Sequence, residues 1–402
     1  MTFRLATASF PDADPVDIDI EDERISAITS AGSTPYTGTQ YDLAGHVVLP
    51  SFVEPHAHLD KAFLADRINN PTGDLLGAIN GLEAVRNTIT FDDIVERAVR
   101  AAELMSRNGV TSIRTHADTT VDGGLTSVLA LLEAKRRCSD FIDIQVAMLL
   151  GWPVTGKESA SNRALALDAI AAGVDVVGGC PHLDLHSHQA VEYFLQLALD
   201  HNLPLDLHAD ENLRKTSDDL EYLADVMLRD NITHQVSASH CVALSMQTSE
   251  KIRRVAEKVA RAGITVTALP HTNLFLQGRE ITSSVPRAIT PVHLLRQSGV
   301  VVAAGADNVQ DPFNPIGRAD PLETASLMVL AAHQSPTDAS SMVTSAASKV
   351  VHNHESKIAV GEVANLVAIP ATNVREAIAM GPPDRFVVYG GVAISHQKRN
   401  IK

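Results

Sequence analysis

The chain has 402 residues, of which 45% are hydrophobic and 20% are charged, and its formal net charge is −15. This composition is typical of a globular protein and excludes a disordered or fibrous chain. The acidic balance, the absence of a local basic patch and the 4% share of aromatic residues argue against a nucleic-acid partner.

The cysteines and the apolar segments bear on where the protein works. Cys138, Cys180 and Cys241 are widely spaced and form no C-x-x-C pair, so neither a disulfide framework nor a cysteine zinc site is expected. No segment approaches the roughly 18 apolar residues of a membrane span, and the first residues lack the apolar core of a signal peptide. We therefore expect a cytoplasmic protein without a membrane partner.

The first elements along the chain are strands, predicted at residues 17–20 and 24–28 around a short turn. From residue 46 to residue 310, short β-branched segments then alternate with longer helical patterns. Strands are predicted at 47–53, 110–115, 142–148, 174–177, 204–208, 235–240, 264–269 and 300–304. Helices are predicted at 91–108, 125–137, 162–172, 188–202, 217–228, 248–262 and 291–298, with Gly109, Gly173, Gly263 and Gly299 as stops before the next strand.

Eight strands that alternate with helices predict a (β/α)8 barrel of the TIM type, with a doubly wound open sheet as the structural alternative. Beyond the barrel, further strands are predicted at residues 360–361, 365–370 and 386–394. We expect residues 1–48 and 356–402 to form a small β-sandwich domain, and residues 49–355 to form the barrel domain.

Polar side chains follow several barrel strands where each strand ends. His56 and His58 come directly after an apolar run, and residues two apart on an extended segment point the same way. His208, His240 and Asp307 end or follow three other strands. Because a barrel gathers the carboxyl ends of its strands around one mouth, we expect these five side chains to meet and to bind a metal ion.

Three imidazoles and one carboxylate leave a divalent ion open to water, whose pKa the ion lowers towards about 7. Glu211 lies three residues past His208, where it can move protons between that water and a leaving amine. His240 is either a fourth imidazole ligand or a group that stabilises the attacking water. A second metal ion is not expected, because segment 177–182 offers no lysine to bridge two ions.

The other histidines and the absent motifs narrow the chemistry. His182, His186 and His188 are predicted to be loop residues, and the role of His116 stays open. The chain has no phosphate-binding G-x-x-x-x-G-K-[ST] loop, no G-x-G-x-x-G after the first strand and no G-x-S-x-G elbow. The H-x-E…P-C-x-x-C pattern of the small zinc deaminases is also missing.

The motifs PSFVEPHAHLDKAF, LDLHADE, SASH and GADNVQDPFNP together resemble the amidohydrolase superfamily, and within it the cytosine deaminase branch. The resemblance implies one catalytic iron or zinc ion held by His56, His58, His208 and Asp307. It implies Glu211 as the proton shuttle, and His240 as the group that orients the water whose proton Asp307 accepts. It also implies that Gln277 lies by the substrate pocket, and enzymes of this branch are often homo-oligomers.

The chain departs from the cytosine deaminase pattern at the substrate. Leu150, close to Trp152, stands where those enzymes carry a glutamine that reads the pyrimidine amide. Asn308 replaces a second acidic residue, and Lys61 resembles the lysine of relatives that act on N-alkylated triazines. Loops 61–90, 151–162 and 309–319 are expected to form the pocket walls.

These features predict a metal-dependent hydrolase that removes an amino group from a small nitrogen heterocycle and releases ammonia. The alternatives are removal of an alkylamine from a triazine-type ring and opening of a cyclic amide. A binding protein built on a barrel is a different class, but it would not need Glu211 and His240 beside an open metal position.

Overall fold

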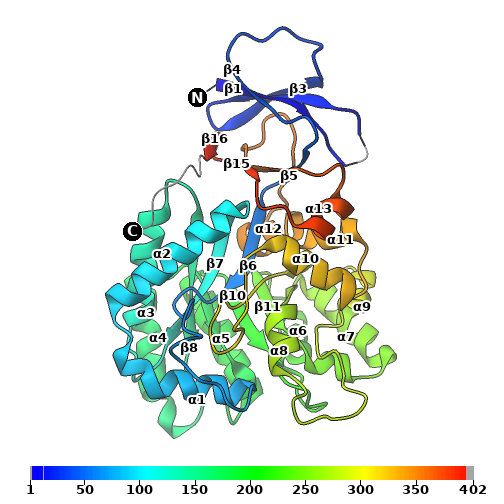
Figure 1. Ribbon diagram of the computed structural model, residues 1–402. Coiled ribbons are helices and arrows are strands. Elements are labelled where there is room, and N and C mark those ends of the chain that lie inside the picture. The colour runs from blue at the N-terminus through cyan, green and yellow to red at the C-terminus, as the bar shows by residue number, and fades with distance from the viewer. Residues whose placement is uncertain (1, 12, 395–402) are drawn as a thin grey trace.

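An eight-stranded parallel sheet forms the centre of the molecule (Figure 1). The structure is a computed structural model, which describes residues 2–11 and 13–394. In sheet order, which is also chain order, the strands are β6 (Phe52–Ala57), β7 (Val110–Thr119), β8 (Asp143–Leu150), β9 (Val177–Gly179), β10 (Leu205–Ala209), β11 (Val236–His240), β12 (Thr265–Ala268) and β13 (Val302–Ala304). A parallel bridge between Ala57 and Asp307 joins the last strand to the first, so the sheet closes as the (β/α)8 barrel that the sequence predicts.

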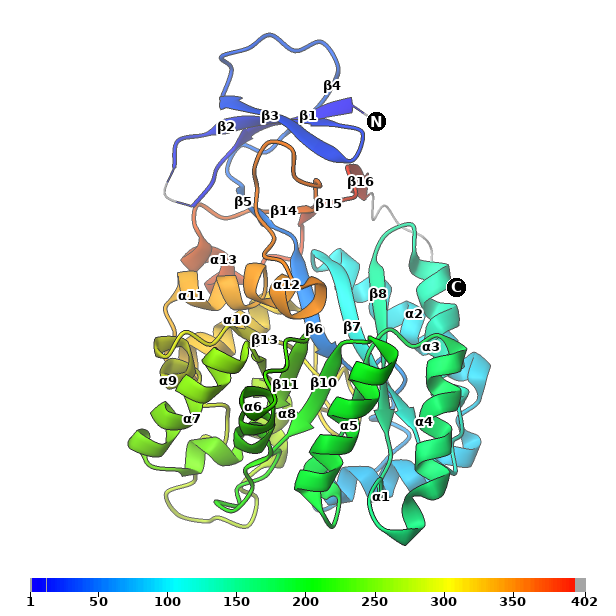
Figure 2. The ribbon, with the colours of Figure 1, turned by 180° about the vertical axis from the view of Figure 1, so that it is seen from behind.

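Helices surround the barrel in the front view and in the view from behind (Figures 1 and 2). They are α1 (Leu75–Val85), α2 (Phe91–Arg107), α3 (Thr126–Cys138), α4 (Ala160–Ala172), α5 (Ser187–His201), α6 (Asp219–Arg229), α7 (Ser249–Ala262), α8 (Pro270–Leu276), α9 (Val292–Gln297), α10 (Pro321–Leu330), α11 (Pro336–Met342), α12 (Ser345–His352) and α13 (Val374–Met380). Gly173 and Gly263 end α4 and α7 with φ angles of +101° and +71°, a region that glycine adopts without steric cost. None of the described helices is long and apolar enough to cross a membrane.

The single strand predicted at 47–53 is in fact two strands in two sheets. β5 (Val47–Pro50) pairs with β14 (Leu366–Ile369), and the next strand along the chain, β6, enters the barrel. The change occurs at Ser51, whose N–H donates to the carbonyl oxygen of Asn365 at 3.0 Å. An apolar run cannot reveal this change, because both strands are buried and therefore read alike.

The chain ends form two further four-stranded sheets at the end of the barrel opposite α1 (Figures 1 and 2). The first holds β1 (Thr2–Ala8), β2 (Val16–Glu21), β3 (Arg24–Ser30) and β4 (Thr39–Asp42), and the second holds β5, β14, β15 (Phe386–Tyr389) and β16 (Val392–Ile394). Leu5 and Ile18 from the first sheet pack with Val48 and Val388 from the second in one apolar cluster, as a β-sandwich requires.

Two predictions about these end strands are wrong in detail. Residues 360–361 form a turn, and the run 386–394 is a hairpin of β15 and β16 rather than one strand. The predicted domain boundaries at residues 48 and 356 stay a prediction, and residues 395–402 of that domain lie outside the described part of the chain.

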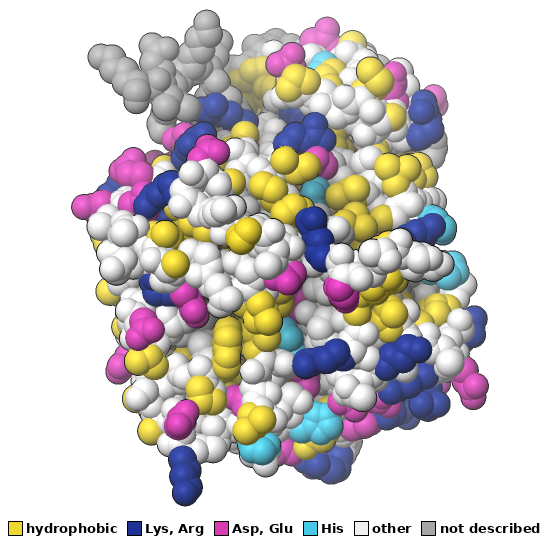
Figure 3. Space-filling view, turned by 60° about the horizontal axis from the view of Figure 1, so that its bottom comes forward, with side chains coloured by type: hydrophobic (Ala, Val, Ile, Leu, Met, Phe, Trp, Pro, Cys, Tyr) yellow, Lys and Arg dark blue, Asp and Glu magenta, His cyan; other side chains and the backbone are white. Residues whose placement is uncertain are grey.

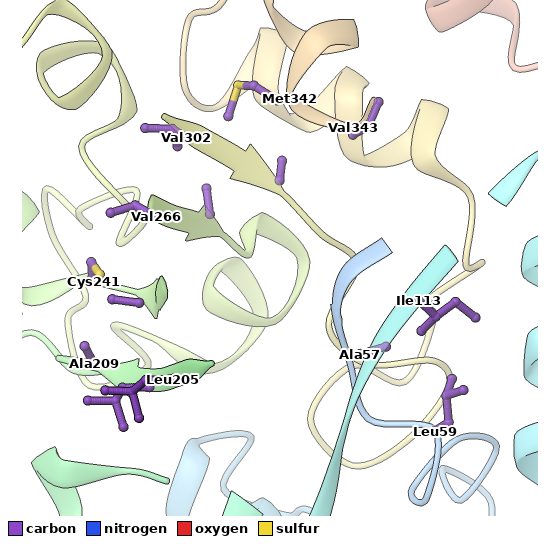
Figure 4. Packing of buried hydrophobic residues seen from close by; sticks show 14 of the residues in the cluster. Ala57, Leu59, Ile113, Leu205, Ala209, Cys241, Val266, Val302, Met342 and Val343 are labelled. Carbon is purple, nitrogen blue, oxygen red and sulfur yellow. The ribbon is translucent and has the colours of Figure 1, made fainter. Parts of the chain in front are cut away.

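The barrel has a continuous apolar core between strands and helices. Figure 4 shows part of it, with Val266 and Val302 on neighbouring strands and Met342 on a helix nearby. Inside the barrel lies a buried ion pair, in which Arg114 donates to Asp206 at 2.8 Å. The middle of the barrel is thus packed with side chains, as is usual for this architecture.

Candidate active site

The polar side chains predicted at the strand ends meet at one mouth of the barrel. β6 carries His56, and His58 follows it by one residue. β10 carries His208, and Asp307 lies three residues beyond β13. All four side chains are buried, with at most 6% of any residue exposed. Figure 3 views the molecule from this end, and a histidine is visible in a hollow of the surface.

The ligand atoms of this cluster lie at the spacing of a coordination shell. His208 Nε2 is 3.1 Å from His56 Nε2 and 3.2 Å from His58 Nε2. Asp307 Oδ1 is 3.2 Å from His58 Nε2 and 3.8 Å from His56 Nε2. Ligands about 2.0–2.1 Å from a tetrahedral zinc ion lie about 3.4 Å apart, so these atoms fit around one cation. Burial lowers the pKa of His56 and of His208 well below the ordinary value, which favours the neutral imidazole that binds metals.

His116 completes the buried histidine group, and the sequence left its role open. Its ring centroid lies 4.0 Å from that of His56 and 4.8 Å from that of His208. Neither of its nitrogens has a hydrogen-bond partner in the described part of the chain. His116 follows Arg114 by two residues on β7, so both point into the barrel, and this period could have indicated an interior position.

Glu211 and His240 lie next to the cluster and to each other. His240 Nδ1 is 3.5 Å from Glu211 Oε1 and accepts a hydrogen bond from Asn273 Nδ2 at 3.0 Å. This bond leaves the ring proton on Nε2, which has no partner in the described structure. Burial, with Asp307 adding to it, raises the pKa of Glu211 well above its ordinary value. Glu211 is therefore suited to hold a proton at neutral pH.

Asp210 fixes the turn that presents Glu211. It adopts a left-handed φ of +55°, and its carboxylate accepts from the N–H groups of Asp219 and Leu220 at the start of α6. It also accepts from the Ser217 hydroxyl at 2.8 Å. The adjacent carboxyl groups of Asp210 and Glu211 therefore differ in role. Asp210 caps the start of α6, and Glu211 faces the cavity.

A hollow opens above the cluster and is lined by residues of all three predicted wall segments. Leu150, Trp152 and Asn308 line it, as do His58, His208, Glu211, His240 and Asp307. The amide of Asn308 is engaged at both ends, because it donates to Asp311 at 2.7 Å and accepts from Thr272 at 3.0 Å. Leu150 is 2% exposed and presents an apolar surface.

Gln277, which the resemblance implied to lie by the substrate pocket, contacts the backbone of Glu211. It is outside the residues that line this hollow and donates to the backbone carbonyl oxygen of Glu211 at 3.3 Å. Gln277 is the residue that directly follows α8. Its side chain points towards the segment that follows β10.

Three charged residues line the hollow but received no role from the sequence: Lys61, Asp118 and Arg86. Lys61 contacts Asp118 at 2.6 Å, and Asp118 lies 3.4 Å from Arg86. The spacing of Asp118, two residues after His116 on β7, could have indicated that it faces the mouth. Arg86 carried no such signal, because it lies on a loop segment whose path the sequence does not show.

Comparison with known proteins assigns the family. The profile of the amidohydrolase family matches residues 64–393. The chain belongs to the amidohydrolase family. Pterin deaminase of Rhizobium rhizogenes is 29% identical to this amidohydrolase over 384 residues, which are 94% of this chain and 87% of the relative.

Solved structures agree with the assignment. The structure of 5-methylcytosine deaminase from Klebsiella pneumoniae with 5-fluorocytosine superposes with a TM-score of 0.90 at 27% identity and covers 98% of both chains. N-isopropylammelide isopropylaminohydrolase from Burkholderia multivorans superposes with a TM-score of 0.83 at 25% identity, also over 98% of both chains. The predicted resemblance to the cytosine deaminase branch is thereby confirmed.

Proposed function

We propose that this amidohydrolase uses one divalent ion, iron or zinc, to remove the amino group of a nitrogen heterocycle by hydrolysis. The relatives confirm the prediction at the level of a heterocycle deaminase, since they include a pterin deaminase and a 5-methylcytosine deaminase. The observation that carries the proposal is the close approach of the ligand atoms of His56, His58, His208 and Asp307 next to the hollow that the Glu211 carboxyl lines.

His56, His58, His208 and Asp307 would hold the ion. Both oxygens of the buried Asp307 carboxylate lack a hydrogen-bond donor in the described structure. Such buried, unpartnered ligand atoms are costly unless a cation binds there. The ion would supply water whose pKa is lowered towards neutrality.

The protein's own groups would handle the protons. His240 offers the N–H of its free Nε2 to the attacking water, and Asp307 accepts the proton that this water loses. Glu211 gives its proton to the ring nitrogen next to the carbon under attack and later takes the proton of the added hydroxyl as the carbonyl forms. Asp307 passes the proton that it accepted to the amine, which leaves as ammonia. Attack on the ring carbon interrupts the aromatic system of the ring. The proton transfers that accompany the attack are carried out by side chains held in fixed positions.

Removal of an alkylamine is the second candidate function, and the N-isopropylammelide isopropylaminohydrolase structure favours it. The two reactions share the attack on a ring carbon and differ in the amine released. We also propose a cytoplasmic location, which fits three free cysteines in the described structure.

A substrate panel tests the proposal. The purified enzyme should release ammonia from at least one of pterin, 5-methylcytosine and other amino-substituted rings, and metal analysis should find about one equivalent of iron or zinc. Isopropylamine release from N-isopropylammelide without any ammonia release would establish the second candidate instead. An active protein free of metal would overturn the proposal.

A further inference from the structure

A chain of three charged side chains lines the hollow, and the proposed mechanism does not use it. Lys61 Nζ lies 3.2 Å from Nδ1 of His58 and 2.6 Å from Oδ1 of Asp118. Oδ2 of Asp118 in turn lies 3.4 Å from both terminal nitrogens of Arg86. The chain therefore leads along the wall from the histidine cluster to the guanidinium of Arg86.

Lys61 anchors this chain through two carboxylates. Its Nζ lies 2.6 Å from Asp118 and donates to Oδ1 of Asp60 at 3.3 Å. The neighbouring Nδ1 of His58 carries the ring proton when Nε2 of that ring binds an ion, so it accepts no bond from Lys61. Because Lys61 is 4% exposed, its buried ion pair holds Asp118 in place without help from Arg86.

Arg86, by contrast, has donors that the protein does not use. Two of its five N–H groups face one oxygen of Asp118 at 3.4 Å, near the outer limit of a hydrogen bond, and the described structure gives it no other partner. Its side chain is 20% exposed and lines the hollow. Gly123 keeps this position open, because a Cβ there would lie 3.3 Å from Nη1 of Arg86.

The rest of the wall is suited to a flat ring. Leu75, Ile79 and Leu82 of α1 line the hollow together with Leu149 and Leu150 of β8. These apolar side chains contact the faces of an aromatic ring but do not read its edge. Leu150 in particular offers no hydrogen bond where cytosine deaminases carry a glutamine.

We infer that Arg86 is the specificity-determining residue of this site and that it binds two adjacent acceptor atoms of a fused two-ring 2-amino-4-oxo heterocycle. The two acceptors are the oxo oxygen and the neighbouring nitrogen of the second ring, which lie side by side in the ring plane. An arginine fork matches such a pair, as it does the O6 and N7 atoms of guanine. A single-ring substrate offers only one of the two acceptors.

The inference rests on the proposed function, since it takes the amine-bearing carbon to face Glu211. The binding step is tested separately from the chemistry by using 2,4-dioxopteridine, which has no amine to lose, and its 5-deaza analogue, in which a C–H replaces the acceptor nitrogen.

In the metal-loaded protein, the deaza replacement should weaken binding about tenfold, measured as the dissociation constant. In Arg86→Ala the same replacement should change binding by less than about twofold, because its partner is gone. Arg67→Ala is the matched control, since Arg67 lies on the other side of α1 along the chain, pairs with Asp93 at 2.7 Å and does not line the hollow. It should behave as the unaltered protein, and Arg86→Lys should restore only part of the discrimination.

The inference would be overturned if the deaza replacement raised the dissociation constant by the same factor in Arg86→Ala and in the unaltered protein. It would also be overturned by the failure of both two-ring compounds to bind while a single-ring amine is deaminated, a result that leaves the proposed function intact. Arg86-dependent binding without ammonia release from 2-amino-4-oxopteridine or any other amine would instead overturn the proposed function and leave the inference standing.

Discussion

At the scale of single residues, environment separates side chains that look alike in the sequence. Asp210 and Glu211 are neighbours, yet the first accepts three hydrogen bonds at the start of α6 and the second faces the cavity. His240 is held by Asn273, whereas His116 has no partner in the described structure. Roles at this scale follow from what each polar atom touches.

Replacing Glu211 with glutamine tests the proton-transfer role. Glu211→Gln should lower the turnover number by about 100-fold or more, because an amide cannot donate and accept a proton in this way. Metal content should not change, since Glu211 lies outside the proposed ligand set. Glu83→Gln is the control, because Glu83 lines the rim of the same hollow and has no proposed role. Near-normal turnover in Glu211→Gln would remove the role.

At the scale of elements, the seam where the barrel closes also builds the site. The N–H of His58 donates to the carbonyl oxygen of Asp307 at 3.0 Å, and the N–H of Asp307 donates to that of His56 at 3.1 Å. The buried carboxyl of Glu54 accepts from the N–H groups of His56 and Ala306 across the same seam. The proposed ligands on β6 and beyond β13 are therefore fixed relative to one another by backbone pairing.

The Glu54 carboxyl should make stability depend on pH. Burial raises its pKa from 4.5 to about 8, so between these values the folded chain keeps a proton that the unfolded chain has lost. The free energy of unfolding should therefore fall as pH rises through this range, by up to about 1.4 kcal/mol per pH unit.

Glu54→Gln mimics the protonated carboxyl and should remove this dependence, as measured by denaturant unfolding of the metal-free protein at several pH values. Glu257→Gln, at an exposed position on α7, should keep the slope of the unaltered protein. Parallel curves for Glu54→Gln and the unaltered protein would contradict the assignment.

At the scale of the whole molecule, the core and the site are separate sources of stability. The main apolar cluster joins residues of all eight barrel strands and most of the surrounding helices, and it does not depend on a bound ion. The site, in contrast, buries three imidazoles and a carboxylate in close contact with one another. A cation bound to the folded chain alone adds stability by mass action.

Removal of the metal should therefore abolish turnover without unfolding the protein. Chelation should lower the thermal midpoint by about 5–10 °C, and added zinc or ferrous iron should restore both the midpoint and the turnover. The midpoint of His58→Ala should respond much less to either treatment. A midpoint that is indifferent to metal in the unaltered protein would show that the cluster binds no ion.

The sequence by itself determined the alternation of strands and helices, the strand-end histidines and the family, because each depends on neighbours a few residues apart. The two-residue period of an extended segment placed His56 and His58 on one side of the chain. These are local properties of an extended chain. They do not depend on how the rest of the molecule folds.

Only the tertiary structure decided which distant residues touch. The break at Ser51, the pairing of β5 with β14 and the contact of Gln277 with Glu211 depend on how separate segments pack. The approach of Arg86 to Asp118 depends on the path of the chain after α1. No local pattern encodes that path, because loop conformation is set by the surface over which the loop lies.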